Sequence, residues 1–388
     1  IYAVPEGTVV FPGEPLLRFH GTTTEAMLLE TGLSMIMNHE SLIATKARRV
    51  RTVAPKDALM EFGLRRAQGH SAGLWGARAA MIGGFNGTSN VEAGKQFGIP
   101  VLGTMAHSWV MSFDEEIDAF REYVRQYHDN LILLADTYNV LEMGVPHAIQ
   151  VFKELKEEGR LPGKYGIRID SGDIAYLSQE ATRMFTEAGF PDAIISGSND
   201  LDEYTIQSLK AQGCTVTSWG VGTKIITADG TSALGGVFKM AVKESDGKEV
   251  PVMKFSNDVE KMTNPGIKTV YRFYKKDTGK MITDLVCLHD EKAADGGDFT
   301  LVTESAKWRR KELKAGTYTV EELLRPVVEN GRNLPLPALF EIIRYADKQM
   351  DTLWPEYTRL LNPDLMEINL SDKLQTLKSE LIRRELGE

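Results

Sequence analysis

One histidine stands at a place in this sequence where an imidazole can do chemistry. His107 lies in GTMAHSWVMSF, residues 103–113, which continues a short apolar run that begins at Ile99. A catalytic imidazole needs an acid that accepts its second ring N–H, and Asp136, in LADTYN, ends another apolar run. The alternative is a histidine packed in the core with one hydrogen bond. The other histidines lack an acid or a glycine beside them at a strand end, and for them we favour a structural role: His20, His39, His70, His128, His147 and His289.

A second group of candidate side chains lies in RIDSGD, residues 168–173, directly after a run typical of a strand. Carboxylates beside a Ser-Gly turn, here Asp170 with Ser171, can hold ribose hydroxyls or a hydrated Mg²⁺ ion. An Asp at this place can instead cap the helix that begins near Ile174. Asp173 suits the cap better and Asp170 suits the ligand better, and the residues alone leave both interpretations open.

Glycine-rich ends of two later apolar runs indicate an anion site. GSND begins at Gly197 and GVGTK at Gly220, and in β/α barrels the loops after the last strands often bind phosphate through backbone N–H groups. Lys239, Lys254 and Lys261 could add positive charge, although each by itself is typical of a solvated surface. The loop GGFNGTSN, residues 83–90, matches no phosphate-binding fingerprint and fits an ordinary turn.

The segment EFGLRRAQG, residues 61–69, combines an aromatic ring with paired arginines. Phe62 could stack on a flat ring while Arg65 or Arg66 pairs with a carboxylate, which suits a planar anionic ligand. A solvated basic turn beside a core phenylalanine is the alternative, and composition alone favours that alternative.

The elements that must position these side chains alternate along the middle of the chain. Short apolar runs are separated by amphipathic segments with three- and four-residue spacing, and the runs begin at Ile99, Asn130, Tyr165, Asp192 and Cys214. Strands alternating with helices predict a parallel sheet, either open or closed into a barrel. All five strand ends carry Gly, Ser, Thr, Asn, Asp or His, and the active sites of β/α barrels lie at that edge. Glycines stand where the helices should end: Gly159, Gly189 and Gly213.

The two flanks of this region differ from it. Residues 1–21 and 234–300 contain short β-like runs separated by turns such as SDGK and DTGK, which predicts one discontinuous β-rich domain. A long helical pattern, TTTEAMLLETGLSMIMNHESLIATKARRV, leads from the first piece into the middle region. We therefore expect an α/β protein with an irregular β/α barrel over residues 22–233 and a mostly helical, charged C-terminal extension over residues 301–388.

Composition excludes several classes of protein. The net charge of −9 has the wrong sign for general binding of nucleic acid, so any bound phosphate must be held by local groups. The sequence has no apolar run long enough for a membrane span, and its first residues do not form a signal peptide. Cys214 and Cys287 are the only cysteines, which argues against a disulfide scaffold, excludes a multi-cysteine metal site and fits a reducing cytosol.

Together these segments resemble the nicotinate phosphoribosyltransferases. The resemblance covers residues 6–275 and rests on motifs in the family's order: EGTVVFPGEPLLR, LLETGLSMIMNHESLIATKA, EFGLRRAQG, FNGTSN, GTMAHSW, LADTYN, IRIDSGD, ISGSNDLDE, GVGT and LGGVFK. It implies a type II phosphoribosyltransferase fold, an irregular α/β barrel joined to a β-rich domain. It also implies a cytoplasmic enzyme of NAD salvage with small-molecule substrates and a homodimer with shared active sites.

The implied reaction transfers the 5-phosphoribosyl group of phosphoribosyl pyrophosphate to the ring nitrogen of nicotinate, giving nicotinate mononucleotide and pyrophosphate. ATP hydrolysis is coupled to this transfer through a phosphohistidine, which the motif similarity assigns to His107, with Asp136 orienting the ring. Mg²⁺ accompanies the phosphates, and Asp170 contacts the ribose or the metal. By the same similarity Phe62 stacks on the pyridine and Arg168 holds the nicotinate or ribose end. The other implied substrate contacts are Arg65, Ser171, Lys239 and Lys254, with Gly197, Ser198, Gly220, Gly222 and Thr223 at the 5-phosphate.

One position bears on the choice of pyridine. Related nicotinamide enzymes have an Asp at the end of an FKGTD-like loop, and this sequence has Ser89 in the matching FNGTSN. A Ser hydroxyl can donate to the carboxylate of nicotinate, whereas an Asp would repel it. The resemblance therefore implies nicotinate, with nicotinamide or another pyridine as the alternative substrate.

The sequence departs from the family at its start. Family members usually carry a further segment with a TDLY-like motif, whose tyrosine stacks on the pyridine across a dimer interface, and no residues here match it. The sequence begins without Met, so we expect it to be part of a longer chain. Two other classes of function are alternatives: a phosphate-binding barrel lyase or isomerase, which needs a catalytic Lys or Glu at a strand end, and a non-catalytic nucleotide sensor.

Overall fold

The computed structural model describes residues 1–256, 262–292, 297–302 and 310–387. The chain divides into two compact units, which we call the α/β unit (Asn38–Leu234) and the β-rich unit (Ile1–Met37 with Gly235–Glu388). The long helix α1 (Thr23–Val53) contributes residues to both units, as its unbroken helical pattern predicts. Within the described ranges, no helix is both long enough and apolar enough to cross a membrane.

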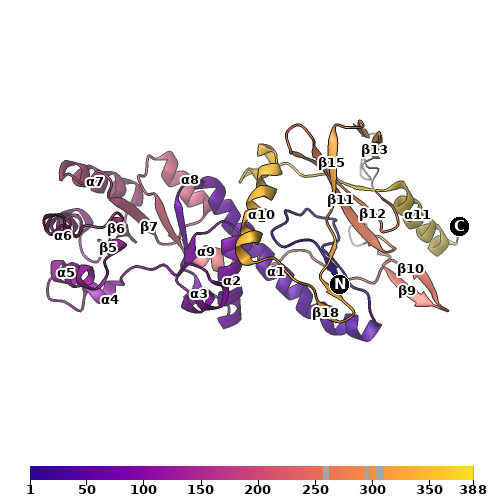
Figure 1. Ribbon diagram of the computed structural model, residues 1–388, viewed down its shortest axis with the longest axis horizontal. Coiled ribbons are helices and arrows are strands. Elements are labelled where there is room, and N and C mark those ends of the chain that lie inside the picture. Colours follow the sequence, from indigo (N-terminus) through magenta and orange to yellow (C-terminus); the bar gives the residue numbers. More distant parts are fainter. Residues whose placement is uncertain (257–261, 293–296, 303–309, 388) are drawn as a thin grey trace. The chain divides into compact units, whose positions relative to one another are not determined.

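The α/β unit is built on a parallel sheet that is curled into a half barrel (Figure 1). Its six strands are β3 (Ala58–Glu61), β4 (Gly87–Thr88), β5 (Leu131–Leu134), β6 (Tyr165–Ile169), β7 (Ile194–Ser198) and β8 (Ser218–Val221). Their order across the sheet is β4-β3-β8-β7-β6-β5, and every pair is parallel. Because parallel strands point the same way, their polar carboxyl ends meet at one edge.

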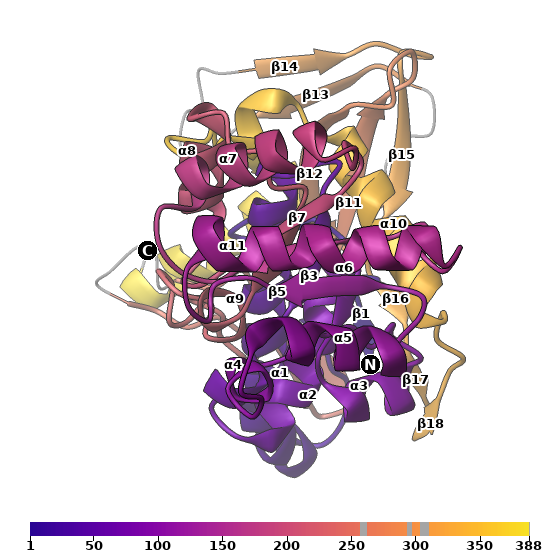
Figure 2. The ribbon, with the colours of Figure 1, turned by 90° about the vertical axis from the view of Figure 1, so that its left-hand side faces the viewer.

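Helices follow the strands of this sheet. They are α2 (His70–Ile82), α3 (Val91–Phe97), α4 (His107–Val110), α5 (Glu116–Gln126), α6 (Val145–Glu157), α7 (Ile174–Glu187), α8 (Glu203–Ala211) and α9 (Thr223–Ile226), with short turns η1 (Leu64–Arg66) and η2 (Val140–Gly144). Figure 2 shows α5, α6 and α7 side by side along the sheet. Gly159, Gly189 and Gly213 have positive φ directly after α6, α7 and α8, which confirms the predicted helix ends.

The centre of the sheet is packed so closely that one position requires glycine. A Cβ atom on Gly166 in β6 would lie 1.9 Å from the carbonyl oxygen of Ile194 in β7. The side chains beneath are large and buried: Phe152 and Phe190 pack against the ring of Tyr165, and Phe185 packs against Phe152. Close approach of these strands therefore holds their carboxyl ends in fixed register.

The β-rich unit contains several sheets. The largest has the order β15 (Tyr318–Glu322), β11 (Lys268–Lys275), β12 (Met281–Leu288), β19 (Ile368–Leu370), and a second pairs β16 (Arg325–Pro326), β1 (Tyr2–Ala3) and β2 (Leu17–Arg18). The described residues also form three antiparallel pairs: β9 (Val242–Ser245) with β10 (Lys248–Pro251), β13 (Phe299–Val302) with β14 (Arg310–Leu313), and β17 (Val328–Glu329) with β18 (Arg332–Asn333). Among the described residues, its helical elements after α1 are α10 (Leu339–Thr352), η5 (Pro355–Thr358) and α11 (Asp372–Leu386).

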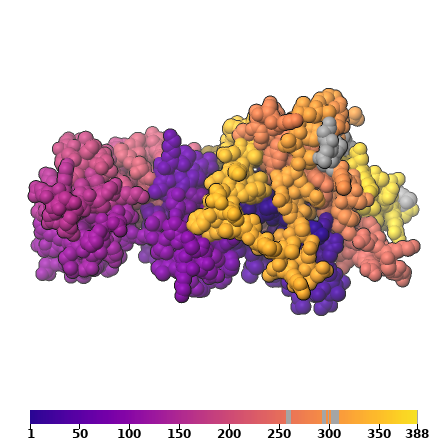
Figure 3. All heavy atoms as spheres, in the orientation of Figure 1, coloured from indigo at the N-terminus to yellow at the C-terminus, as the bar shows by residue number. Residues whose placement is uncertain are grey.

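The two sequence-distant parts of the β-rich unit are joined by strands and by a buried charged group. In Figure 3 the indigo N-terminal residues lie beside orange residues of the C-terminal part, where β1 pairs with β16. The guanidinium of Arg272 in β11 is fully buried and donates to both carboxylate oxygens of Asp284 in β12, at 2.9 and 2.7 Å. Glu14, from the N-terminal segment, is also fully buried, 3.9 Å from the Arg272 guanidinium.

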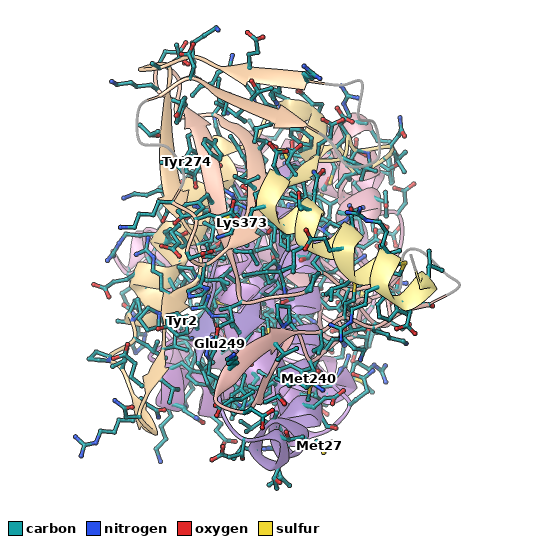
Figure 4. The ribbon with its side chains drawn as sticks, turned by 90° about the vertical axis from the view of Figure 1, so that its right-hand side faces the viewer. Tyr2, Met27, Met240, Glu249, Tyr274 and Lys373 are labelled. Atoms are coloured by element: carbon teal, nitrogen blue, oxygen red, sulfur yellow. The ribbon has the colours of Figure 1, made fainter. Side chains whose placement is uncertain are left out.

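The start of α11 is tied to this unit by an ion pair at the surface. Figure 4 shows Lys373 at the start of α11 and Tyr274 on the large sheet. The Lys373 ammonium is 2.5 Å from the Asp290 carboxylate, which follows β12.

Burial raises the pKa of the Tyr274 hydroxyl to about 12, so this phenol stays neutral.

The predicted β-like runs after residue 234 correspond to β9, β10, β11 and β12, whereas the C-terminal region differs in detail from its prediction. The described residues between 299 and 333 form six short strands before α10 and α11, and β19 then pairs with β12 in the large sheet. In the middle of the chain, the run from Ile99 forms only a single bridge between Val101 and Thr88, because Pro100 cannot donate to a ladder. The strands β3 and β4 were not predicted.

Candidate active site

The carboxyl ends of the parallel strands bring together most of the polar segments that the sequence singled out. His107 begins α4, Asp136 and Thr137 follow β5, and Asp170 follows β6. Ser198 ends β7, and Phe62 follows β3 beside the end of β8. Residues from five places in the sequence therefore meet at one edge of the α/β unit.

His107 lies at the centre of this group, with its side chain 40% exposed. Its Nδ1 atom is 3.2 Å from the Thr137 hydroxyl, and its Nε2 atom is 3.6 Å from the nearer carboxylate oxygen of Asp170. The same Nε2 is 4.0 Å from Asp136 Oδ1. The imidazole is therefore fixed on one side by a hydroxyl and faces two carboxylates on the other, which favours a functional histidine over a core histidine.

Asp136 is the buried member of the pair of acids, with only 1% of its side chain exposed. Its Oδ2 accepts hydrogen bonds from the Asp170 backbone N–H at 3.0 Å and from the Ser171 hydroxyl at 2.5 Å. Its Oδ1, the atom nearest to His107, is buried and has no hydrogen-bond partner in the described part of the chain. A fixed carboxylate with one uncommitted oxygen towards the ring can offset a positive charge on the imidazole.

Asp170 is more open, with 30% of its side chain exposed. Its Oδ1 accepts a hydrogen bond from Ser198, and its Oδ2 lies 3.5 Å from the Arg168 guanidinium as well as near His107. Arg168 also donates to Thr104, and its buried Nε has no hydrogen-bond partner in the described ranges. Asp173 instead caps α7, because its carboxylate accepts the Tyr176 backbone N–H at 3.1 Å.

The ends of β7 and β8 form a compact backbone surface beside the acids. After Ser198 the chain adopts positive φ at Asn199 and Asp200, at 87° and 41°. Gly220 in β8 has no side chain, and a Cβ there would lie 2.8 Å from the ring of Phe62. The Phe62 ring therefore rests against β8, next to the predicted phosphate-binding ends.

The turn after β8 and the turn after β3 are in direct contact. Gly222 precedes Thr223, the first residue of α9, and a Cβ on Gly222 would lie 2.9 Å from the Phe62 carbonyl oxygen. The Phe62 backbone N–H donates to Val221 at 2.9 Å. Arg65 follows in η1 and is exposed to solvent.

Ser89 follows β4 and is exposed between two buried residues, Thr88 and Asn90. The Asn90 side chain caps α3 by accepting the Ala93 backbone N–H at 3.1 Å. The loop predicted to be an ordinary turn is therefore a strand end that presents one hydroxyl. Within the described residues, that hydroxyl has no hydrogen-bond partner.

Three predicted lysines lie outside the α/β unit or outside the described residues. Lys239 and Lys254 are exposed residues of the β-rich unit, and the Lys239 ammonium donates to the Phe238 carbonyl at 3.0 Å. Lys261 lies outside the described residues. Within the α/β unit the structure groups the acids, His107, Phe62, Ser89 and the glycine-rich ends, and the roles of Lys239 and Lys254 stay predictions.

Sequence reasoning missed two buried carboxyls near the site. Glu61 ends β3 and hydrogen-bonds to Thr88 and to the Gly63 backbone. Glu116, at the start of α5, is 2.8 Å from His147 Nδ1. Burial raises the pKa of both carboxyls; the negative charge of Asp136 further raises the pKa of Glu116, and the hydrogen bond from His147 lowers it. The sequence pattern does not mark ALME as a strand, although a strand there places Glu61 at a strand end.

The described residues contain no group of three or more His, Cys, Asp and Glu side chains arranged to hold a metal ion. Cys214 and Cys287 are both free thiols. The site therefore consists of one imidazole, two carboxylates, a guanidinium, hydroxyls and glycine-rich backbone. Such a set can bind phosphate and hydroxyl groups and can carry a transient charge on the imidazole.

Comparisons with known proteins show which family the chain is similar to. The profile of the Nicotinate phosphoribosyltransferase (NAPRTase) family matches residues 58–292, and that of the Nicotinate phosphoribosyltransferase C-terminal domain matches residues 267–378. Nicotinate phosphoribosyltransferase of Bacillus subtilis (strain 168) is 41% identical over 98% of this chain and 77% of its own length. The Homo sapiens enzyme of the same name is 32% identical over 98% of this chain and 79% of its own length.

Solved structures give the same result. The crystal structure of human Nicotinic Acid Phosphoribosyltransferase superposes with a TM-score of 0.84 at 31% identity, covering 98% of this chain and 82% of that one. The nicotinate-nucleotide pyrophosphorylase of Pyrococcus furiosus has a TM-score of 0.70 at 24% identity, covering 90% of this chain and 80% of that one, and shares the fold. The family match, these identities and the shared architecture together establish that the chain belongs to the nicotinate phosphoribosyltransferase family of enzymes.

Proposed function

We propose that this enzyme couples ATP hydrolysis to phosphoribosyl transfer through a phosphohistidine at His107, and that the reaction serves NAD salvage. The observation that carries the proposal is the position of the imidazole, whose Nε2 is 3.6 Å from Asp170 and 4.0 Å from Asp136. A histidine that accepts a phosphoryl group becomes cationic in the transfer, and two nearby carboxylates stabilise that charge. Its 40% exposure leaves room for a nucleotide phosphate to approach.

The acids then have separate tasks. Asp136, held by the Ser171 hydroxyl and the Asp170 backbone, orients His107 and does not leave its place during turnover. Asp170 is the more exposed acid, so its carboxylate reaches the substrate side of the site. Thr137 holds the other ring nitrogen at 3.2 Å and restricts rotation of the imidazole.

Transfer of the phosphoribosyl group needs positioning more than a protein nucleophile. Loss of pyrophosphate leaves an oxocarbenium-like carbon, so the enzyme must fix the ribose phosphate, the leaving group and the pyridine nitrogen in line. We assign the 5-phosphate to the backbone at Gly197, Ser198, Gly220, Gly222 and Thr223. Arg168 would contact the ribose or the nicotinate carboxylate, using the Nε that has no partner in the described protein.

Mg²⁺ would enter with the phosphates. The Asp170 carboxylate, with its exposed side, fits an ion that keeps most of its water and uses one or two carboxylates. When bound, the ion neutralises charge on the pyrophosphate that leaves. Ser198 and Arg168 hold Asp170 at the edge of the sheet and keep this carboxylate in place for such an ion.

The pyridine would lie on Phe62, whose ring is supported by Gly220. Arg65 supplies a cation for the nicotinate carboxylate, and the exposed hydroxyl of Ser89 donates to the same group. Nicotinate, and not nicotinamide, fits this set because both groups are donors and neither repels a negative charge.

We further infer a cytoplasmic homodimer with shared active sites that acts on small molecules and not on nucleic acid. The two free thiols support a reducing compartment, and the net charge of −9 opposes binding of nucleic acid. Lys239 and Lys254 are assigned to phosphate binding in that assembly. Sedimentation of the purified protein tests the dimer directly.

The decisive experiment for the phosphohistidine follows ³²P from [γ-³²P]ATP into the protein. We expect acid-labile incorporation in the wild-type protein and none in His107→Ala, because no other histidine faces two carboxylates in the described part of the chain. The His147→Ala variant is the matched control and should keep the label. Equal labelling in wild type and His107→Ala would refute the assignment, as would acid-stable label.

A further inference from the structure

We propose that Glu61 is the residue that positions both sides of the pyridine site and so sets the discrimination between nicotinate and nicotinamide. One carboxylate oxygen of Glu61 holds the Phe62–Gly63 turn, and the other holds the loop that carries Ser89. The inference rests on the proposed function, since it assigns Phe62 and Ser89 to the pyridine.

The first contact of Glu61 fixes the turn that carries Phe62. Its Oε1 accepts the Gly63 backbone N–H at 2.5 Å. No side chain fits at Gly63, because a Cβ there would lie 2.5 Å from Ile226 and 2.7 Å from Glu61 Oε1. The backbone between Glu61 and Gly63 is therefore closed into a tight turn, and Phe62 projects from it.

The second contact fixes the loop that carries Ser89. The Thr88 hydroxyl donates to Glu61 Oε2 at 2.5 Å and accepts the Asn90 backbone N–H at 3.0 Å. The Ser89 backbone N–H donates to the Glu61 carbonyl at 3.0 Å. Hydrogen bonds of the Ser89 backbone N–H and of its neighbours Thr88 and Asn90 thus fix the position of Ser89, while its side chain stays exposed.

The surroundings of Glu61 suggest no role for its carboxyl other than these two contacts. The residue is fully buried, and no cation pairs with it among the residues that the structure describes. Burial raises the pKa of its carboxyl, and the hydrogen bonds from Thr88 and Gly63 lower it. A buried carboxyl without a cation costs free energy that an apolar side chain would not, so we attribute its presence to the two loops that it joins.

Two variants remove the link without changing the size of the side chain. Glu61→Gln presents an NH₂ group to one of the two donors, and Thr88→Val removes the hydroxyl while keeping the shape. Thr88→Ser keeps the hydroxyl and serves as the control for Thr88→Val. Glu203→Gln is the control for the loss of a buried carboxyl, because Glu203 is equally buried in the same unit but pairs with Lys46 and Arg49.

The expected readout is specificity and not general loss of activity. In Glu61→Gln and Thr88→Val, KM for nicotinate should rise about tenfold or more, since Phe62 and Ser89 are no longer held in place against the pyridine. KM for phosphoribosyl pyrophosphate should stay within about twofold, and the nicotinate to nicotinamide ratio of kcat/KM should fall. Because both changes break one link, the double variant should be no worse than the more affected single variant.

Two results would overturn the role of Glu61. One is an unchanged nicotinate to nicotinamide ratio in both variants, with only the loss of thermal stability that Glu203→Gln also shows. The other is additive effects in the double variant, which would mean that Glu61 and Thr88 act separately. If Glu61→Gln fails to fold, the nicotinate to nicotinamide ratio of Thr88→Val alone still tests the inference, and an unchanged ratio there would overturn it.

Binding of labelled nicotinate by equilibrium dialysis makes this test independent of turnover. Wild-type protein that binds nicotinate but takes no label at His107 would contradict the phosphohistidine, and the affinities of the Glu61 and Thr88 variants would still be compared. Wild-type protein that takes the label while the variants bind nicotinate as tightly as it does would contradict the inference alone.

Discussion

Ser89 is the residue at which a single side chain is expected to select the substrate. Its hydroxyl is exposed between buried neighbours and has no partner in the described chain, so it is available to a ligand. In Ser89→Asp, the new carboxylate would face the carboxylate of nicotinate. We expect kcat/KM for nicotinate to fall by about tenfold or more, because like charges at contact cost several kcal/mol.

Steady-state kinetics with both pyridines checks this prediction. Ser89→Asn is the matched control, since it has nearly the size of Asp but no charge, and it should lose less nicotinate activity. The nicotinamide activity of Ser89→Asp should not fall in parallel. An unchanged kcat/KM for nicotinate in Ser89→Asp would remove Ser89 from the pyridine site.

Residue types at strand ends were the part of the site that could be predicted from the sequence. His107, Asp136 and Asp170 each follow an apolar run, and parallel strands bring such positions to one edge. The partners of the site residues could not be predicted, because only the folding of the sheet brings Thr104 to Arg168 and Thr137 to His107. The sequence pattern indicates where along the chain a functional side chain lies. Its hydrogen-bond partners are known only once the fold is known.

At the scale of the elements, the apolar pattern of the sequence predicts some strands of the parallel sheet and not others. The strands β5, β6, β7 and β8 lie within the runs predicted from apolar residues, and β5 and β8 are entirely buried. The strand β3 has four residues and ends in a charged one, and β4 has only two. Both are strands because β8 and β3 offer them hydrogen-bond partners, which no local pattern encodes.

The approach of β6 to β7 is the element-scale feature with the clearest stability consequence. Gly166→Ala would place a Cβ 1.9 Å from the Ile194 carbonyl oxygen, so one strand must shift. We expect a loss of about 1–3 kcal/mol or more in the free energy of unfolding, in the range of overpacked cores. Activity should fall with it, because the shift displaces Arg168, Asp170 and Ser198 at the strand ends.

Urea unfolding monitored by circular dichroism measures this change. Gly163→Ala is the control, since a Cβ there meets nothing within 4 Å and Gly163 does not have positive φ. Its free energy of unfolding should stay within about 0.5 kcal/mol of wild type. Equal stability of the two variants would show that β6 and β7 adapt, and that the close approach does not hold the site.

At the scale of the whole molecule, long-range pairing explains what the sequence did not reveal of the C-terminal region. Its strands find partners far along the chain: β19 pairs with β12 and β16 pairs with β1. The helical periodicity of this region correctly predicts α10 and α11. It does not predict the strands, because their pairing partners lie far along the chain. The N-terminal segment and the C-terminal region therefore fold as parts of one β-rich unit.

The buried group that joins the N-terminal segment to this unit makes stability depend on pH. Burial, with the neighbouring Asp284 carboxylate, raises the pKa of Glu14 to about 10. The folded state thus keeps a proton on Glu14 that the unfolded state releases above its ordinary pKa of 4.5. Since the folded state binds more protons in that window, stability falls as pH rises, by at most roughly 1.4 kcal/mol per pH unit for one proton.

Glu14→Gln tests this directly, because Gln stays neutral at every pH and its NH₂ can still donate to Asp284. Free energies of unfolding are measured for both proteins between pH 5 and 8, below the lowered pKa of about 8 for Lys268, whose titration has the opposite sign. Glu61 and Glu116, with raised pKa values, are present in both proteins and cancel in the difference. Wild type should lose stability more steeply with pH than Glu14→Gln, whereas parallel curves would mean that Glu14 is ionised in the folded protein and that Arg272 balances both carboxylates.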